Sequence, residues 1–324
     1  MDDTIAAWRD DGVTGGFVER QRCPACGGAD FHELYRCPYD RPPIRSVLER
    51  RYAPFGPVDL SPLDGTDYVL AECQTCRLIF QQFIPDDDLM TLVYERWQPP
   101  EVSLEHKERN ALASRGRNAL EVMSVIDYFG GDAIRITVLD FGMGWGNWCR
   151  VAQAFGCETY GAEVSAARID HAAAFGISAM TPERAADHTY DFINTEQVFE
   201  HLVDPLGTAR LLAGTLKPNG VLKISVPNGH RVRRNLALGA WSAPKKSLRT
   251  LNAVSPLQHI NCFVHQSLVA LGEQASLVPV RIPTRLRYRY LPTWERPSSL
   301  LRRTVGLHYR AIRAQSTVVW FRRR

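Results

Sequence analysis

Val138-Leu-Asp-Phe-Gly-Met-Gly-Trp-Gly146 is an apolar run that ends in an acid and continues into a loop with three glycines. The helical spacing of residues 147–155 follows it, so the stretch predicts a strand, a tight turn and a helix. Open α/β sheets bind ligands at the carboxyl ends of their strands, where such a turn lies. Glycine has no Cβ, so the backbone can approach a ligand closely here. The stretch therefore predicts a ligand-binding loop.

Strands and helices alternate along the chain from this loop onward. The predicted strands are 136–140, 158–163, 177–180, 190–195 and 221–226, and the helices between them are 147–155, 165–175 and 205–216. Two later apolar segments, 278–282 and 316–321, are predicted to be the last two strands, an antiparallel pair. This pattern predicts an α/β fold: a doubly wound, mostly parallel, seven-stranded Rossmann-like sheet with an antiparallel last strand.

The spacing of the glycines and one later acid narrow the choice of ligand. Glu163 stands 23 positions after Asp140, at the end of the second strand, where a carboxylate can accept both hydroxyls of a ribose. The dinucleotide fingerprint G-x-G-x-x-G requires a third glycine where this chain has Asn147. A pyrophosphate needs the close approach which that glycine permits, whereas S-adenosylmethionine has no phosphate. The pattern favours S-adenosylmethionine.

Four blocks in order resemble the class I S-adenosylmethionine-dependent methyltransferases, over roughly residues 110–280. They are residues 138–146, Tyr190-Asp-Phe-Ile-Asn-Thr-Glu196, Gln197-Val-Phe-Glu-His-Leu202 and Leu216-Lys-Pro-Asn-Gly-Val-Leu222. The resemblance implies a cofactor loop, a ribose contact at Glu163 and a wall beside the methionine part of the donor. The loop residues would be Asp140, Phe141, Gly142, Gly144 and Gly146, and the wall residues Thr195, Glu196 and Gln197.

Three residues are candidates for the catalytic groups. Methyl transfer is an in-line displacement on an activated donor, so the protein aligns the acceptor and removes its proton. His201 lies beyond the fourth predicted strand, and its unperturbed pKa near 6.5 suits a proton acceptor. Glu200 beside it would orient or anchor. His259 stands in a segment that resembles one which approaches the acceptor in similar enzymes. The alternative for His201 is that it caps a helix. The alternative for His259 is that its ring forms a hydrogen bond with a backbone carbonyl and has no catalytic role.

Four of the eight cysteines form two Cys-x-x-Cys pairs, Cys23 with Cys26 and Cys73 with Cys76. Two such turns supply the four thiolates of a closed tetrahedral zinc site, and the apolar residues before each pair indicate a zinc ribbon. The 46 residues between the pairs exceed the spacing of compact ribbons. The alternative is a redox dithiol and a coincidental second pair. The paired cysteines are similar to those of a methyltransferase subgroup that acts on sugars and other small molecules.

These features divide the chain into three parts: a zinc-ribbon-like domain at 1–85, a helical connector at 86–130 and a methyltransferase domain at 131–324 with a basic insertion at 283–315. Residues 102–129 have the apolar spacing of an amphipathic helix. The loop 231–258 is long enough for a substrate lid. It carries six basic residues, which would suit an anionic acceptor.

The net charge of +4 is too small to indicate a nucleic-acid-binding protein. Residues 281–324 hold 12 Arg and one acid, so the rest of the chain is acidic. The basic segment could contact an anionic surface. The chain shows neither a basic, apolar leader nor an apolar run near the ~18 residues of a membrane span, so we expect a cytoplasmic protein.

The leading prediction is methyl transfer to an oxygen or carbon of a small biosynthetic acceptor, such as a sugar or glycan intermediate. One alternative is an RNA methyltransferase that grips its substrate with the Arg-rich segment. The acidic body counts against nucleic acid as a partner. A second alternative is a non-catalytic, zinc-binding interaction protein, against which the intact glycine loop counts.

Overall fold

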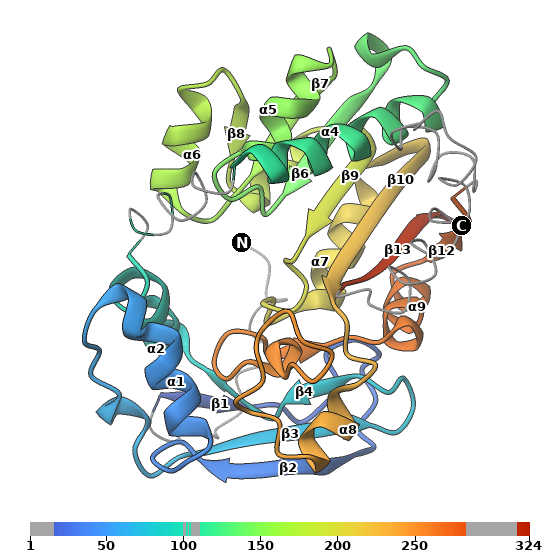
Figure 1. Cartoon of the computed structure of the whole chain (residues 1–324). Helices are drawn as coiled ribbons and strands as arrows, with labels where there is room; N and C mark the ends of the chain where they lie inside the picture. Colours follow the sequence, from blue (N-terminus) through green and yellow to red (C-terminus); the bar gives the residue numbers. More distant parts are fainter. Residues whose placement is uncertain (1–15, 100–101, 103, 105–110, 283–315) are drawn as a thin grey trace, which may run out of the picture.

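Seven strands form one sheet in the computed structural model, which describes residues 16–99, 102, 104, 111–282 and 316–324 (Figure 1). In spatial order they are β12 (Leu277–Val280), β13 (Ser316–Arg323), β10 (Leu216–Pro227), β9 (Tyr190–Glu196), β6 (Thr137–Phe141), β7 (Glu158–Ala162) and β8 (Ser178–Met180). The strands from β10 to β8 pair in parallel, and β13 runs antiparallel to both β10 and β12. The predicted sheet is confirmed.

Helices cover both faces of this sheet. Helices α4 (Ala111–Tyr128) and α5 (Asn147–Ala154) pack on one face, and α7 (Pro205–Gly214) and α9 (His265–Gln274) on the other. Helix α6 (Ala166–Ala173) packs beside β8. Successive strand residues point to opposite faces, and accordingly Val138 is buried against α4 and α5, whereas Leu139 is buried with residues of α7 and α9. The central strands β6, β9 and β10 are mostly buried along their length because both faces of the sheet are covered.

The N-terminal residues form a second, antiparallel sheet, which occupies the lower part of Figure 1. Its strand order is β11 (Asn261–Cys262), β4 (Ile79–Gln81), β3 (Asp67–Cys73) and β2 (Phe31–Pro38). The strand β1 (Phe17–Glu19) pairs with β5 (Phe83–Pro85). The helices here are α1 (Ile44–Tyr52), α2 (Asp87–Thr91), a π-helical turn at Leu92–Arg96 and α8 (Val232–Ala237). Single 3-10 segments lie at Ala53–Phe55, Ser61–Leu63, Ala133–Arg135, Pro182–Asp187 and Asn252–Val254.

The segment 231–258 packs on this second sheet through some of its residues, whereas residues 244–246 are exposed; its role as a substrate lid stays a prediction. Val232, Leu236 and Trp241 are buried in one apolar cluster with residues of α1 and β3. The buried amide of Gln81 on β4 donates to the backbone oxygens of Ser255 and His259, at 3.2 and 3.1 Å.

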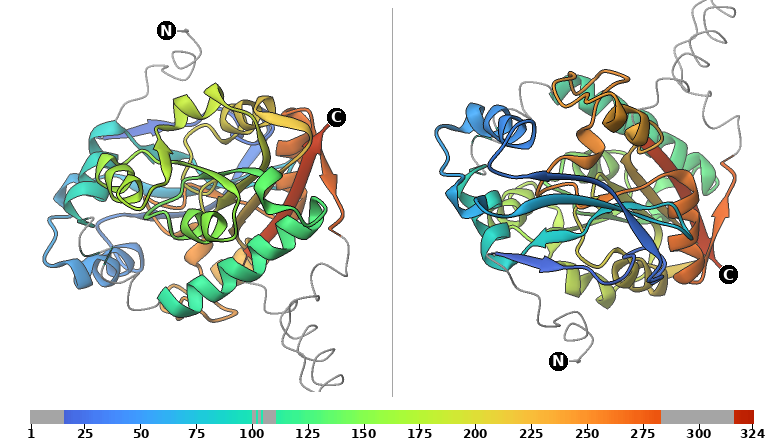
Figure 2. Two further views of the ribbon diagram at one scale, coloured as in Figure 1. Left: turned by 90° about the horizontal axis from the view of Figure 1, so that it is seen from above. Right: turned by 90° about the horizontal axis from the view of Figure 1, so that it is seen from below.

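The two sheets share one apolar core and several hydrogen bonds. Cys73 and Phe80 of the second sheet are buried in the same cluster as Leu139 of the seven-stranded sheet. The buried guanidinium of Arg20 donates to the side chain of Asn261 at 2.8 Å and to the backbone of Val203 at 3.1 Å. Figure 1 shows the second sheet below the seven-stranded one, and Figure 2 gives the views of the molecule from above and from below.

Some predicted features fall outside the residues that the structure describes. The basic insertion 283–315 and its contact with an anionic surface are among them, as is part of the connector before α4. Within the described residues, no helix combines the length and the apolar character that a membrane span requires. The four cysteines outside the two Cys-x-x-Cys pairs, Cys37, Cys149, Cys157 and Cys262, are buried.

Candidate active site

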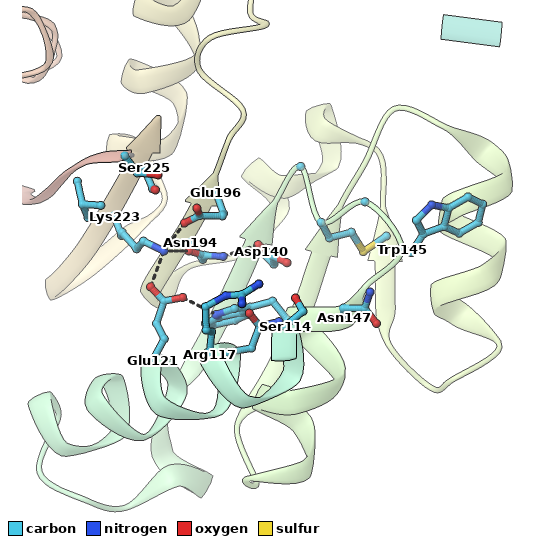
Figure 3. Close-up of a pocket in the computed structure, with 17 residues that line it drawn as sticks. Ser114, Arg117, Glu121, Asp140, Trp145, Asn147, Asn194, Glu196, Lys223 and Ser225 are labelled. Carbon is cyan, nitrogen blue, oxygen red and sulfur yellow. Dashed lines mark hydrogen bonds and ion pairs between the residues drawn. The ribbon is translucent and has the colours of Figure 1, made fainter. Parts of the chain in front are cut away.

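A cavity of about 720 Å³ lies at the carboxyl ends of β6, β9 and β10 (Figure 3). Helix α4, the glycine loop, the strand ends and the start of β13 line it. The lining residues are Ser114, Arg117, Asn118, Glu121, Asp140, Gly142, Met143, Gly144, Trp145, Asn147, Trp148, Asn194, Glu196, Lys223, Ser225, Ser316 and Val318. The position agrees with the rule for open α/β sheets, and the volume with that of small-molecule sites.

The glycine loop reaches the cavity because its backbone adopts conformations that other residues avoid. Gly142, Gly144 and Gly146 have φ values of 74°, 55° and 71°. A Cβ on Gly142 would lie 2.5 Å from a methyl carbon of Val198. The amide of Gly142 donates to the oxygen of Ala162 at 2.8 Å, which ties the turn to the end of β7. Left-handed backbone and close approach both require glycine at position 142.

Asp140 closes the end of β6 with a buried carboxyl group. It is 4% exposed, and the amide of Asn194 on the neighbouring strand donates to it at 2.7 Å. Burial raises its pKa to about 7, although the Asn194 hydrogen bond and the positive charge of Lys223 oppose this shift. A cationic ligand in the cavity would favour the ionised carboxylate.

Lys223 carries a buried charge at the centre of the cavity wall. Its ammonium group contacts Glu121 of α4, lies 2.8 Å from Glu196 and donates to Asn194 at 3.0 Å (Figure 3). Burial acts to lower the pKa of Lys223, but Glu121 and Glu196 together raise it above its ordinary value. The lysine is therefore charged, and it holds the carboxylates of Glu121 and Glu196 at the carboxyl ends of the strands.

The sequence prediction missed the charged residues that α4 and β10 contribute. Arg117 and Glu121 were part of a helix described only by its apolar face, and Lys223 was counted as a strand residue. One signal was present: a lysine in the otherwise apolar Val221-Leu-Lys-Ile-Ser-Val226 needs partners if both faces of the strand are covered.

Four of the predicted cofactor residues line the cavity: Asp140, Gly142, Gly144 and Glu196. The other five, Phe141, Gly146, Glu163, Thr195 and Gln197, do not. Gly146 precedes α5, and the hydroxyl of Thr195 donates to the oxygen of Lys223 at 3.0 Å inside the sheet. These five residues support the loop and the strand ends from outside the cavity lining. A contact of any of the five with the donor stays a prediction.

Glu163 braces the glycine loop. Its buried carboxylate accepts from the amides of Gly144 at 2.9 Å and Val164 at 3.0 Å, and Arg168 lies 3.5 Å away. These contacts join the end of β7 to the loop that follows β6. The ribose contact predicted for Glu163 would use a carboxylate that the loop already holds in place.

The three predicted catalytic residues lie together, outside the residues that line the cavity. Nε2 of His201 is 3.8 Å from a carboxylate oxygen of Glu200, and the rings of His201 and His259 are 4.9 Å apart. Nδ1 of His201 lies 2.8 Å from the backbone oxygen of Gln258 and 3.2 Å from the hydroxyl of Tyr94. Residues from three distant parts of the sequence thus meet here.

Burial keeps this cluster uncharged. It raises the pKa of Glu200 to about 8 and lowers the pKa of His201 to about 4. It also holds the pKa of His259 well below the ordinary value, with the positive charge of a protonated His201 as the next cause. Both imidazoles are therefore neutral at pH 7, the form that accepts a proton or binds a metal.

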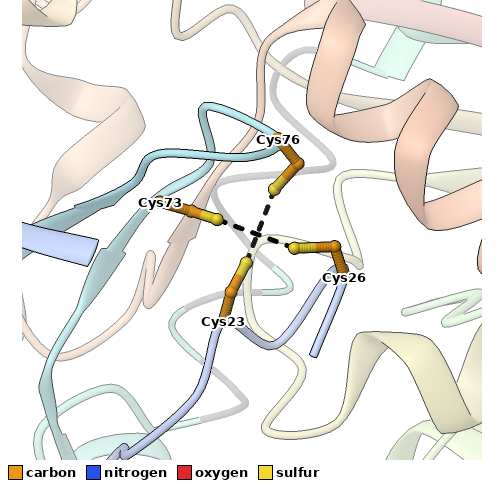
Figure 4. A group of neighbouring side chains, drawn as sticks. All are labelled: Cys23, Cys26, Cys73 and Cys76. Carbon is orange, nitrogen blue, oxygen red and sulfur yellow. Dashed lines mark hydrogen bonds between the residues drawn. The ribbon is translucent and has the colours of Figure 1, made fainter. Parts of the chain in front are cut away.

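The four paired cysteines converge on one point (Figure 4). The sulfur of Cys23 lies 3.5 Å from that of Cys76, and the sulfur of Cys26 lies 3.6 Å from that of Cys73. These spacings are too long for a disulfide. The ligands of a tetrahedral zinc ion with Zn–S bonds of 2.3 Å are about 3.8 Å apart. The close sulfurs belong to different Cys-x-x-Cys pairs, so the four act as one group.

The two cysteine turns have matching backbones. The amide of Gly27 donates to the oxygen of Cys23 at 2.8 Å, and the amide of Arg77 donates to the oxygen of Cys73 at 3.1 Å. Gly27 and Arg77 are both left-handed, with φ values of 73° and 67°. Each turn therefore presents its two thiols on the same side, an arrangement that could hold a metal ion.

The profile of the methyltransferase domain family matches residues 108–281, from α4 to the end of β12. The chain belongs to this methyltransferase domain family. Its sheet is that of a class I, S-adenosylmethionine-dependent methyltransferase domain. A search among curated proteins gives no match.

Several solved methyltransferase structures resemble this methyltransferase. The plantazolicin methyltransferase BpumL in complex with SAH is 16% identical, with a TM-score of 0.46, over 73% of this chain and 94% of that one. Magnesium protoporphyrin IX methyltransferase (ChlM) from Synechocystis PCC 6803 is 13% identical, with a TM-score of 0.42, over 66% and 86%. The mitomycin 7-O-methyltransferase MmcR is 14% identical, with a TM-score of 0.45, over 72% and 60%.

We expect the methyltransferase to bind S-adenosylmethionine more tightly as the pH rises through about 7. The donor is a cation that favours the ionised form of Asp140, whose pKa burial raises to about 7. Binding should then release a proton below pH 7, with affinity rising by up to about tenfold per pH unit. Calorimetry from pH 5.5 to 7.5 measures this. Asp140→Asn corrects for titration of the ligand itself, and equal slopes for both proteins would contradict the assignment.

Proposed function

We propose that this methyltransferase transfers a methyl group from S-adenosylmethionine to an oxygen or carbon of a small biosynthetic acceptor, such as a sugar or glycan intermediate. The observation that carries the proposal is the cavity where the glycine loop meets the ends of β6, β9 and β10. Its volume suits a donor with a small acceptor. Three acidic and two basic side chains line it, Asp140, Glu121, Glu196, Arg117 and Lys223, and this mixture does not favour a polyanion such as RNA.

The residues of the cavity suit the charges of the donor. S-adenosylmethionine carries a positive sulfonium, a positive ammonium and a negative carboxylate. Asp140 and Glu196 would attract the positive groups, and Arg117 the carboxylate. The Lys223 contacts hold Glu196 in position before the donor arrives. Glu163 would keep the loop in its binding conformation, with the ribose as its predicted ligand.

The cluster of Glu200, His201 and His259 would accept the proton that leaves the methyl acceptor. A neutral His201 has Nε2 available, because Nδ1 faces the oxygen of Gln258. Glu196, which lines the cavity, is close enough for its charge to help raise the pKa of Glu200. This electrostatic link supports a cluster that acts on a molecule in the cavity.

We also propose that Cys23, Cys26, Cys73 and Cys76 hold a structural zinc ion. Four thiolates around one point select zinc or an iron–sulfur cluster, and the spacing of the sulfurs suits a single ion. All eight cysteines are free thiols, which agrees with the proposed cytoplasmic location. The similarity of these pairs to a sugar methyltransferase subgroup is what favours a sugar acceptor.

Methyl transfer to a panel of nucleotide-linked sugars, followed by mass spectrometry, tests the proposal. We expect Asp140→Ala to weaken donor binding, because it removes the buried carboxylate that Asn194 orients. His201→Ala should keep donor binding and lower kcat about 10²–10⁴-fold, the usual contribution of a general base. Gly116→Ala on α4, where a Cβ meets nothing within 4 Å, is the control and should leave both unchanged. A wild-type protein that does not bind S-adenosylmethionine in calorimetry would refute the proposal.

A further inference from the structure

We infer that Glu200, His201 and His259 form a second metal site, for a divalent transition-metal ion with two nitrogen ligands and one carboxylate ligand. One ligand atom from each residue lies within 4.8 Å of the others. Two imidazoles and one carboxylate are ligands that Zn²⁺ and Fe²⁺ accept in sites with open positions. The inference goes beyond the proposed methyl transfer, since metal binding at these residues can be measured without a methyl acceptor.

The first observation is a group of buried polar atoms without partners. Glu200 is 1% exposed, and neither of its carboxylate oxygens has a hydrogen-bond partner among the described residues. Nδ1 of His259, which is 7% exposed, also has none. A buried polar atom without a partner costs about 1–3 kcal/mol. Three such atoms in one small space therefore call for a ligand that satisfies all of them, and a metal ion does so.

The second observation is the orientation of the histidines. Nδ1 of His201 faces the backbone oxygen of Gln258 at 2.8 Å, so this nitrogen carries the proton and Nε2 points its lone pair toward Glu200. The backbone of Asn252 forms a hydrogen bond with the ring of His259. Metal-binding histidines commonly donate their other N–H to a carbonyl, which fixes the ring and its tautomer. Both rings have this support, and one nitrogen of each lies within 4.8 Å of a carboxylate oxygen of Glu200.

The chain holds the three residues in place before any ligand arrives. Asn261 follows His259 closely, and its amide side chain donates to the oxygens of Phe199 at 2.9 Å and Leu202 at 2.7 Å. The backbone amide of Asn261 donates to the oxygen of Glu200 at 3.0 Å. These bonds join the turn after β9 to the segment before β11. The ligands are thus preorganised on two segments that lie far apart in the sequence.

The charges around the cluster indicate what would complete the coordination. Arg51 and Lys245 both face His201 closely enough to lower its pKa, and Tyr94 lies beside the ring. Because Arg51 and Lys245 are positively charged, they favour an anionic oxygen as a further ligand of the metal. A metal ion also lowers the pKa of a hydroxyl bound to it. If the proposed methyl transfer is correct, an acceptor hydroxyl bound to this ion would release its proton to water more easily. Nε2 of His201 would then be a ligand of the ion and not the base, because one nitrogen lone pair cannot do both.

Titration of the whole, metal-free chain with Co²⁺ tests the site. We expect two ions per chain. Cobalt at the four cysteines gives intense thiolate charge-transfer absorption, and cobalt at Glu200, His201 and His259 gives only weak visible bands. In Glu200→Gln and His259→Asn the second ion should bind at least about 100-fold more weakly, since loss of a ligand exceeds the usual effect of its hydrogen-bond partner. The thiolate absorption should persist, which shows that each variant is folded.

His188→Asn is the matched control. His188 contacts Tyr160 of β7 and is not one of the proposed ligands, so this variant should keep both ions. One ion per chain in the wild-type protein, with the same titration in Glu200→Gln, would overturn the inference and indicate water or acceptor groups as the partners of the buried atoms. Calorimetry with S-adenosylmethionine separates the two proposals. Donor binding without a second metal leaves the methyl transfer standing, and a second metal without donor binding leaves only the metal site.

Discussion

Replacement of Cys73 by serine should remove one metal ion from the chain and lower its melting temperature by about 10 °C or more. Structural zinc contributes its binding free energy to folding, and loss of such an ion costs about 4 kcal/mol or more. The sulfur of Cys73 lies 3.6 Å from that of Cys26 and is fully buried. Cys73 also packs in the apolar cluster that contains Leu139 of β6, so we expect both sheets to unfold at the lower temperature.

Metal content by mass spectrometry and thermal unfolding followed by circular dichroism check this expectation. Cys157→Ser is the matched control, because Cys157 is buried to a similar degree outside the four-sulfur group. It should keep all bound metal and lose only about 1 kcal/mol of stability. If Cys73→Ser and Cys157→Ser have equal metal content and equal melting temperatures, the cysteines do not form a structural zinc site.

The seven-stranded sheet could be predicted from the sequence because the patterns that indicate its strands and helices are local. Each strand is a short apolar run, each helix follows within a few residues, and the glycines of residues 142–146 mark the turn between β6 and α5. The predicted ranges differ from the observed ones by a few residues at the ends. The alternation alone identifies a parallel sheet, since parallel strands need helical crossovers.

The second sheet and the cavity wall depend on contacts between distant residues, which the pattern of one segment does not contain. β11 pairs with β4 across about 180 positions, and Trp241, which stands in a stretch with the composition of a loop, is buried with residues of α1 and β3. Glu121 and Glu196 lie far apart in the sequence and meet at Lys223. The role of each polar residue becomes visible only when its partner is known.

Replacement of Gly142 by alanine should weaken S-adenosylmethionine binding by about 10–100-fold. The backbone of Gly142 has a φ of 74°, which costs an alanine about 1–3 kcal/mol. The new Cβ would also lie 2.5 Å from a methyl carbon of Val198, so the loop or Val198 must move. Since each 1.4 kcal/mol is a factor of ten, displacement of the loop accounts for the expected loss.

Calorimetric titration with S-adenosylmethionine and S-adenosylhomocysteine measures the loss, and a second change separates its two causes. Val198→Ala removes the methyl groups that the new Cβ would meet, so Gly142→Ala with Val198→Ala should regain part of the affinity. The backbone cost of the left-handed φ stays in the double variant, so recovery should be incomplete. Gly116→Ala, in open space on α4, should bind both ligands as the wild-type protein does. Wild-type affinity in Gly142→Ala would mean that the donor does not depend on this loop, and the cavity would then have to bind it through Asp140, Glu196 and α4 alone.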